Sequence, residues 1–340
     1  MAVLFMDSFD HYVSADITKK WTSLSVTAIS AANGRNGTAS ARMSNYFNEL
    51  KKTLTAKQTH IIGVALRISA YPASNQALIS LYDGATTQCD VRITSAGKLL
   101  VTRAGTQLGT TGTTILSLNT FYYIEFKCKI DNTTGTTEVH INTVAEANLT
   151  TTGQDTQNTA NATADTLKLG DVNNGGTAAN VDWDDLYWCD NSGAQNNDFL
   201  GDCRVQALLP SGAGGNTQWT PLSGANYTNV DEAAPNDDTD YVSDATVGDR
   251  DTYAYGDLAS STGNVKAIQT MHYARKDDAG TRTIAPVVRI GATNYDQANL
   301  PNLSTSYQYL PQIEELSPAS GIAYTVSEIN GAEFGTKVIA

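Results

Sequence analysis

The stretches HIIGVALRIS (residues 60–69) and FYYIEFKCKI (residues 121–130) decide the fold class of this 340-residue chain. In the first, every second residue is apolar and falls on one face: Ile62, Val64, Leu66 and Ile68. In the second, the apolar face is formed in the same way by Tyr122, Ile124, Phe126, Cys128 and Ile130. Alternation with a period of two is typical of a strand that buries one face. Both stretches are therefore predicted to be strands.

The rest of the first half repeats this pattern, with turn residues between short apolar runs. Residues 89–103 are predicted to form two strands around a turn at residues 95–97, and residues 128–142 a hairpin. Two more strands are predicted at residues 166–170 and 181–190. Charged residues make up only 17% of the chain, against a typical figure of about 25%. Regular short strands joined by turns predict an all-β protein, a sandwich or a barrel.

The length corresponds to about two domains at roughly 150 residues each. We expect a β-sandwich over residues 1–200, with a long surface loop at residues 144–165. Residues 201–340 are expected to form a smaller, acidic C-terminal β-sandwich domain. Its predicted elements are a strand at 203–210, a hairpin over 264–291, and a short terminal helix that starts at Thr325 with Glu328 three residues later as a capping box.

The balance of charge excludes two classes of partner. The net charge is −13, from 35 acidic and 22 basic residues. Nucleic-acid binding and adhesion to anionic membranes both need a basic surface, and no apolar run approaches the ~20 residues that span a bilayer. The N-terminal residues carry no basic leader, and the four cysteines are too few for a disulfide scaffold. We therefore expect no signal peptide and synthesis in a reducing cytoplasm.

The candidates for chemistry are few, and we expect no cofactor and no enzymatic activity. None of the four histidines lies in a zinc-binding pattern, and no nucleophile elbow or phosphate-binding loop occurs. Asp182, Asp184 and Asp185, close to Trp183 and Trp188, are open to two interpretations. They could form a sugar-handling cluster with stacking aromatics, or a solvated strand face backed by core tryptophans. The second interpretation is favoured.

Residues 231–257 contain nine acidic residues and a single base, Arg250. Carboxylates are the oxygen ligands that Ca²⁺ prefers, although aspartate in loops more often caps its own backbone. A calcium site is therefore a hypothesis, with these candidate ligands: Asp237, Asp238, Asp240, Asp249 and Asp251.

Three segments carry a resemblance to a known fold family. LFMDSFDHY (residues 4–12) followed by Trp21, GRNGTASARMS (34–44) and VDWDDLYWCDNSG (181–193) resemble elements of concanavalin-like, or laminin-G-like, jelly rolls. The resemblance implies a jelly-roll β-sandwich over about the first 200 residues. The glucanase branch of that superfamily carries an ExDxxE strand, which this sequence lacks.

The whole chain also resembles uncharacterised structural proteins of tailed bacteriophages and prophages. The segments that carry this resemblance are residues 199–214, 229–253 and 274–291. It implies a non-enzymatic protein on the virion surface, either a tail-fibre or receptor-binding component or a head decoration protein, assembled in the host bacterial cytoplasm. Its implied partners are capsid or tail proteins, further copies of this chain and a host surface glycan.

Two alternatives to a virion role are kept. The first is a carbohydrate-binding module, in which an exposed aromatic such as Trp183, Trp188 or Trp219 stacks on a sugar. The second is a polysaccharide hydrolase that uses the three aspartates of residues 182–185.

Overall fold

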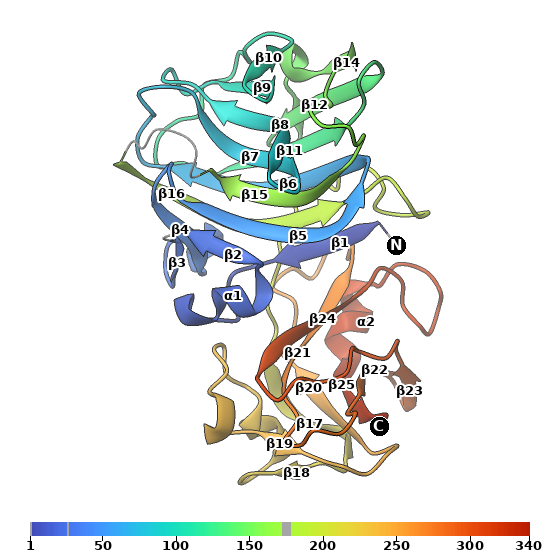
Figure 1. Cartoon of the computed structure of the whole chain (residues 1–340). Helices are drawn as coiled ribbons and strands as arrows, with labels where there is room; N and C mark the ends of the chain where they lie inside the picture. The colour runs from blue at the N-terminus through green and yellow to red at the C-terminus, as the bar shows by residue number, and fades with distance from the viewer. Residues whose placement is uncertain (1, 26, 172–177) are drawn as a thin grey trace. The chain divides into compact units, whose positions relative to one another are not determined.

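The computed structural model describes residues 2–25, 27–171 and 178–340 (Figure 1). It divides into two compact units, Met1–Val205 and Gln206–Ala340. Antiparallel sheets make up most of both units, and a short helix lies near the C-terminus. The predicted all-β class is therefore confirmed.

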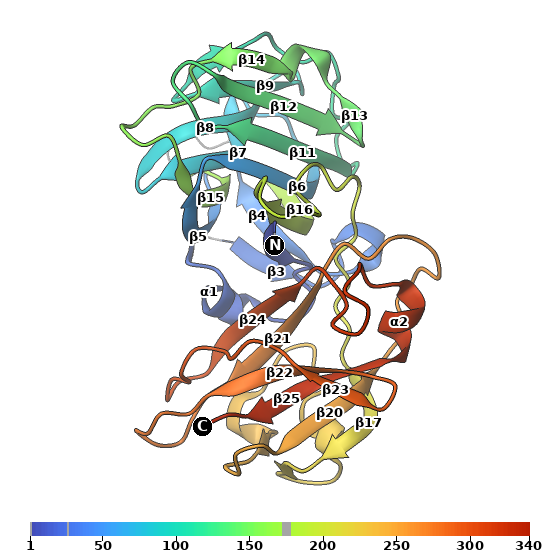
Figure 2. The same ribbon diagram turned by 90° about the vertical axis from the view of Figure 1, so that its right-hand side faces the viewer.

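The N-terminal unit is a sandwich of two antiparallel sheets, which Figure 2 shows as stacked layers. Within the described residues the larger sheet has nine strands in the order β13-β12-β11-β6-β16-β4-β3, with β1 beside β16 and β14 beside β12. Its strands are β1 (Val3–Asp7), β3 (Thr27–Ser30), β4 (Ser40–Asn45), β6 (Thr59–Ile68), β11 (Tyr122–Lys129), β12 (Gly135–Ile141), β13 (Val144–Ala145), β14 (Thr151–Gln154) and β16 (Ala178–Cys189).

The second sheet of this unit has seven strands in the described part, in the order β10-β9-β8-β7-β15-β5-β2. They are β2 (Ser23–Ser25), β5 (Glu49–Lys57), β7 (Gln76–Asp83), β8 (Thr86–Ile93), β9 (Leu99–Arg103), β10 (Thr106–Leu108) and β15 (Ala164–Gly170).

The apolar faces of the two sheets meet in one core. The Cys89 thiol on β8 lies against the Cys128 thiol on β11, so the sheets face each other at this point. Phe126, Trp183 and Trp188 of the nine-stranded sheet are fully buried. Because aromatic side chains each bury roughly 150–250 Å², these three supply a large share of the hydrophobic stabilisation.

The first segment of the chain is tied down around a buried carboxylate. Asp7 Oδ2 accepts hydrogen bonds from Tyr12 Oη and from Trp21 Nε1, both at 2.7 Å. Lys20 Nζ lies 3.0 Å from Asp7 Oδ1, and both side chains are buried. Burial alone would raise the pKa of Asp7, but Lys20 and the hydrogen bond from Tyr12 hold it below its usual value.

Strand β16 carries a β-bulge that decides what it presents to solvent. Asp184 pairs with Ala65 and Tyr187 with Gly63, so β16 has one residue more than β6 between these pairs. The extra residue is Asp185, in the left-handed region with φ 51°. The Tyr187 ring packs directly on Gly63, where a Cβ atom would lie only 2.1 Å from Tyr187 Cε1. A glycine is therefore required at position 63.

The C-terminal unit is a smaller sandwich. Its described strands form a five-stranded sheet in the order β17-β20-β25-β22-β23 and two pairs, β18-β19 and β21-β24. Leu300 and Leu303 join Ile284 of β22 and Leu310 of β24 in one buried cluster, which packs the β21-β24 pair on the larger sheet. The strands are β17 (Pro210–Thr217), β18 (Thr220–Pro221), β19 (Val242–Ser243), β20 (Arg250–Tyr255), β21 (Ile268–Ala274), β22 (Ile284–Ile290), β23 (Thr293–Asp296), β24 (Gln308–Glu314) and β25 (Ala332–Val338).

Helical segments are short throughout the described residues, and none is long and apolar enough to cross a membrane. The predicted terminal helix is confirmed as α2: Thr325 Oγ1 accepts the backbone N–H of Glu328 at 3.1 Å, as an N-cap does. The helices are η1 (Ser14–Asp16), α1 (Ile17–Lys20), η2 (Arg35–Gly37), η3 (Ala147–Leu149), η4 (Asn226–Asn229), η5 (Asp237–Thr239) and α2 (Val326–Gly331).

Three local predictions are wrong. The hairpin over 264–291 does not form, because β21 pairs with β24 while β22 pairs with β25 and β23 in another sheet. Residues 203–209 form no strand, and the next strand, β17, begins at Pro210. The expected loop at 144–165 contains the short strands β13 and β14. Alternation identifies strand-forming segments, but the pairing partner depends on contacts distant in sequence.

Candidate functional site

The candidate site lies on the polar outer face of the nine-stranded sheet, along β16. The two tryptophans of this strand point inward: Trp183 Nε1 donates to Met43 Sδ at 3.4 Å, and Trp188 Nε1 donates to His60 Nδ1 at 3.0 Å. Both tryptophans are fully buried, so neither can stack on a sugar. The structure therefore has the core tryptophans of the favoured interpretation but not its solvated strand face, because Asp182, Asp184 and Asp185 are themselves buried.

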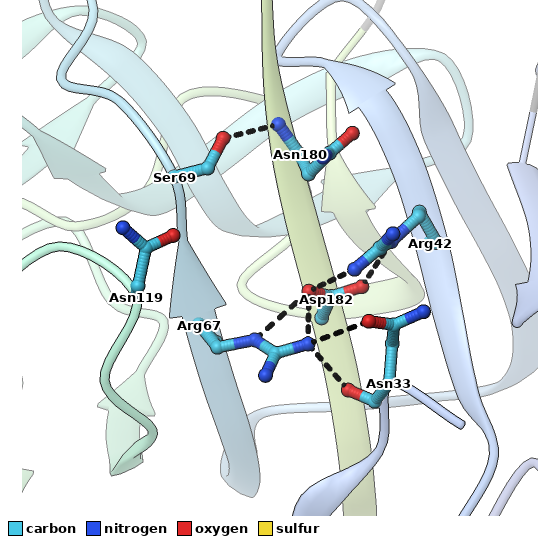
Figure 3. Close-up of a pocket in the computed structure, with 7 residues that line it drawn as sticks. All are labelled: Asn33, Arg42, Arg67, Ser69, Asn119, Asn180 and Asp182. Atoms are coloured by element: carbon cyan, nitrogen blue, oxygen red, sulfur yellow. Dashed lines mark hydrogen bonds and ion pairs between the residues drawn. The ribbon is translucent and has the colours of Figure 1, made fainter.

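Asp182 is held between two arginines from the neighbouring strands (Figure 3). From β4, Arg42 Nε donates to Oδ1 at 2.6 Å and Nη2 donates to Oδ2 at 3.0 Å. From β6, Arg67 donates to Oδ2 through Nε at 3.1 Å and Nη2 at 2.9 Å. The register places these three side chains side by side across β4, β16 and β6.

A pocket of about 290 Å³, partly open to solvent, surrounds this carboxylate. Arg67 Nη2 also donates to the carbonyl oxygen of Asn33, at 2.8 Å, and so fixes one wall. Ser69 Oγ accepts the backbone N–H of Asn180 at 2.7 Å and fixes another. The lining is polar: Asn33, Arg42, Arg67, Ser69, Asn119, Asn180 and Asp182.

Asp184 and Asp185 lie further along the same face in a different environment. Asp184 Oδ2 accepts the backbone N–H of Arg35 at 2.7 Å, and Asp185 Oδ1 accepts that of Val205 at 2.8 Å. Burial, and then the carboxylate of Asp185, raise the pKa of Asp184 to about 8. Burial likewise raises the pKa of Asp185 to about 6, although Arg35 Nη1 lies 3.5 Å away and opposes the rise.

Residues 198–205, here called the covering segment, lie over this second half of the face. At one end, the Phe199 ring packs on His140 with centroids 4.0 Å apart. In the middle, the backbone N–H of Gly201 donates to Glu125 Oε1 at 2.8 Å. At the other end, Asp202 Oδ1 lies 2.5 Å from Arg35 Nη2. The covering segment therefore shields Asp184 and Asp185 from solvent, while the pocket at Asp182 stays open.

Several of these residues were not predicted from the sequence. Glu125 lies on the face of its strand opposite the predicted apolar face, yet it is buried, and its Oε1 accepts a hydrogen bond from Tyr187 Oη at 2.5 Å. Arg42 and Arg67 were not singled out at all. The available signal was an arginine at an outward position of each of two predicted apolar strands, but recognising it requires the order of the strands in the sheet.

The five aspartates proposed as calcium ligands are not gathered into one set. Asp237 accepts from Tyr273 Oη at 2.5 Å, Asp238 pairs with Arg275 at 2.7 Å, and Asp249 Oδ1 accepts from Gln218 Nε2 at 2.9 Å. Asp251 is buried and accepts from Tyr253 Oη at 2.8 Å, and Asp240 is half-buried just after η5. In the part of the chain that the structure describes, no three His, Cys, Asp or Glu side chains are arranged to hold a metal ion.

Comparison with solved structures gives distant likenesses to a cellulose-induced protein, to sialidases and to an alginate lyase. A cellulose-induced protein, Cip1, is 15% identical with a TM-score of 0.39, over 50% of this chain and 91% of Cip1. A Trypanosoma rangeli sialidase is 10% identical with a TM-score of 0.36, over 52% of this chain and only 28% of the sialidase. An alginate lyase of polysaccharide lyase family 7 is 14% identical with a TM-score of 0.30, over 48% of this chain and 77% of the lyase. No family model and no curated protein matches the chain.

These likenesses correct one prediction. The expectation that the chain is not an enzyme is contradicted, because sialidases and an alginate lyase stand among the structures that it matches. We therefore withdraw that exclusion. The comparisons with family models and with curated proteins give no link to a phage protein, and the virion role stays a prediction.

Proposed function

We propose that the N-terminal unit binds carbohydrate in the pocket around Asp182. The observation that carries this proposal is the pocket lining, which consists of amide, guanidinium, hydroxyl and carboxylate groups. Pockets for drug-like ligands are mostly apolar with a few polar groups, so this lining suits a ligand that is itself covered in hydroxyl groups. Its volume, about 290 Å³, lies near the lower end of the usual ~300–1,000 Å³ range and suits one sugar unit.

The hydrogen-bonding groups of the pocket match both roles of a sugar hydroxyl. A hydroxyl group donates one hydrogen bond and accepts others, and an amide side chain can serve either need. Asn119 and Asn180 are exposed at the rim of the pocket, on either side of Ser69. Arg42 and Arg67, on opposite sides of Asp182, add guanidinium donors that are fixed because Asp182 holds both groups in place.

The first test is binding of the full chain to an array of immobilised glycans, followed by calorimetric titration with any oligosaccharide that is retained. Asn180→Ala removes a rim amide, and we expect it to weaken binding about fivefold to tenfold, the equivalent of one neutral hydrogen bond. Asn132→Ala removes the same exposed amide group in the β11–β12 turn, outside the pocket, and serves as the matched control. Retention of no glycan, or equal affinity of the two variants, would contradict the proposal.

The setting that we propose for this binding is the surface of a tailed-phage virion. This setting is supported by a sequence resemblance to structural proteins of tailed bacteriophages, which is carried by residues 199–214, 229–253 and 274–291. Immunogold electron microscopy with an antibody against the purified chain tests it. Gold on the tail or the fibres assigns a receptor-binding role, and gold on the head assigns a decoration role. Detection of the protein only in infected cells, with no gold on the particles, would overturn the virion setting.

A further inference from the structure

We infer that the pocket around Asp182 selects an acidic sugar, whose anionic group lies against Arg42 and Arg67. This inference rests on the proposed function and adds the class of ligand to it. Three observations carry it: the balance of charge in the pocket, the hydrogen-bond donors that the two guanidinium groups leave unused, and the rigidity of those groups.

The pocket carries an excess positive charge. Its charged lining residues are Arg42, Arg67 and Asp182, two cations against one anion. Arg42 alone satisfies both oxygens of Asp182 in a bidentate pair, at 2.6 and 3.0 Å. Arg67 is therefore a second cation that the stability of this carboxylate does not require. In a chain with a net charge of −13, an open pocket with positive excess is a local exception.

Each guanidinium group keeps donors for a ligand. Arg42 and Arg67 both contact Asp182 through Nε and Nη2. Across residues 2–25, 27–171 and 178–340, Nη1 of Arg42 and Nη1 of Arg67 have no hydrogen-bond partner, and Figure 3 shows both arginines directed toward Asp182 from opposite sides. An arginine donates five N–H bonds in a fixed fork that matches carboxylate and sulfate oxygens.

The two groups are also held still, which lowers the entropy cost of binding. Arg67 lies over the Phe121 ring, with its Cζ atom 4.7 Å from the ring centroid. Its Nη2 is tied to the carbonyl oxygen of Asn33 at 2.8 Å. About a quarter of each arginine side chain is exposed, so an anion can reach both groups. A preorganised pair of this kind binds an anionic group without first ordering flexible side chains.

The experiment compares ligands that differ only in charge. A hexuronate oligosaccharide, its methyl ester and the corresponding neutral hexose oligosaccharide are titrated into the full chain at low and at high ionic strength. We expect the uronate to bind at least about tenfold more tightly than the ester, as a charge-assisted hydrogen bond provides. The difference should shrink at high ionic strength because salt screens an exposed pair.

Variants of Arg67 locate the effect. Arg67→Gln is expected to remove the preference for the acid, so that acid, ester and neutral sugar bind with similar affinity. The neutral sugar should lose less affinity than the acid, because for it the variant removes only a neutral hydrogen bond. Arg67→Lys keeps the charge but loses the fork, so it should retain part of the preference. Arg103→Gln is the matched control, since Arg103 is also ion-paired to an aspartate, Asp155, and is similarly exposed, at 30% against 24% for Arg67. Thermal unfolding of each variant verifies that it is folded.

The outcomes separate this inference from the proposed function. Equal affinities for acid, ester and neutral sugar overturn the inference and leave carbohydrate binding intact. Binding of none of them, and of no glycan on the array, overturns both. Preference for a sulfated oligosaccharide over the uronate supports the anionic class and assigns it to sulfate.

Discussion

Asp182 and Asp184 lie two residues apart on β16 and on the same side of the sheet, yet their surroundings differ in every respect that matters for chemistry. Asp182 borders an open pocket and contacts two guanidinium groups. Asp184 is covered, accepts hydrogen bonds from the Arg35 backbone and Thr38, and has Asp185 and Asp10 as its charged neighbours. As a result the pKa of Asp184 rises to about 8.

The difference shows that residue type and strand position do not assign a role to an acid. Cations from two adjacent strands turn one carboxylate into part of a binding surface. A β-bulge and the covering segment turn the other into a buried acid that holds its proton near neutral pH. The open half of the face is therefore suited to recognition, whereas the covered half contributes a dependence of stability on pH.

The largest loss of stability should come from removing the Asp182 carboxylate, in the open half of the face. Asp182→Asn leaves the Arg42 and Arg67 guanidinium groups facing each other without a carboxylate between them. We expect the free energy of unfolding to fall by about 2 kcal/mol, as when one partner of a mostly buried charged pair is removed. Urea unfolding at pH 7 measures it. Asp277→Asn, which changes an exposed loop aspartate, is the control, and an equal loss in both variants would contradict the assignment.

The covered half of the face is tested through the dependence of stability on pH. Asp184 has a pKa of about 8 in the fold and close to 3.9 in the unfolded chain, so between these values the native state binds more protons. Stability therefore falls as pH rises, by up to about 1.4 kcal/mol per pH unit for one group. The clearest window is pH 7 to 8. The histidines with lowered pKa values, such as His60 at about 4, have largely completed their contribution below this window. Lys52, with a pKa lowered to about 8, loses its native proton within the same window and opposes the trend. The difference in slope between the parent chain and an Asp184 variant is therefore the quantity that reports on Asp184.

Chemical unfolding at a series of pH values between 7 and 8 measures this slope. Asp184→Asn removes the titrating group and should flatten it. A slope that is unchanged in the variant would assign the pH dependence to another group.

The smallest loss of stability should come from removing one of the contacts that hold the covering segment. Phe199→Ala removes the ring that packs on His140, and we expect a loss of about 1 kcal/mol, the typical worth of an aromatic pair. The amide hydrogen of Gly201, which is bonded to Glu125, should then exchange faster with solvent. Phe47→Ala is the control, because Phe47 is 44% exposed. Unchanged exchange at Gly201 would show that the segment is held by its other contacts.

The strands were predictable where one face is buried. Residues 60–69 and 121–130 alternate with a period of two, and each lies in the strand that the alternation indicates. Residues 181–190 also lie in the predicted strand, although the alternation holds there only up to Asp184. The helix at Thr325 was predictable because its capping box acts within four residues. The partners of β21 and β22 were not, because a strand edge can pair with any compatible segment and the choice is made by packing.

The candidate site was predictable only in part. The three aspartates of residues 182–185 were recognised, but strict alternation would send Asp185 to the side opposite Asp184. The bulge, with φ 51° at Asp185, places both where loop backbone N–H groups reach them. No local signal announces this bulge, since aspartate tolerates the left-handed region without requiring it.

The sequence by itself determined the all-β class, because period-two burial is a local property of the chain. It also determined the acidic surface, since net charge is a property of composition. The inward direction of both Trp183 and Trp188, which lie five positions apart, depends on the bulge between them. Only the tertiary structure decided that Arg42 and Arg67 meet at Asp182, and that residues 198–205 cover Asp184 and Asp185. These contacts join residues more than a hundred positions apart or depend on a bulge, and their geometry arises from the order and register of the strands.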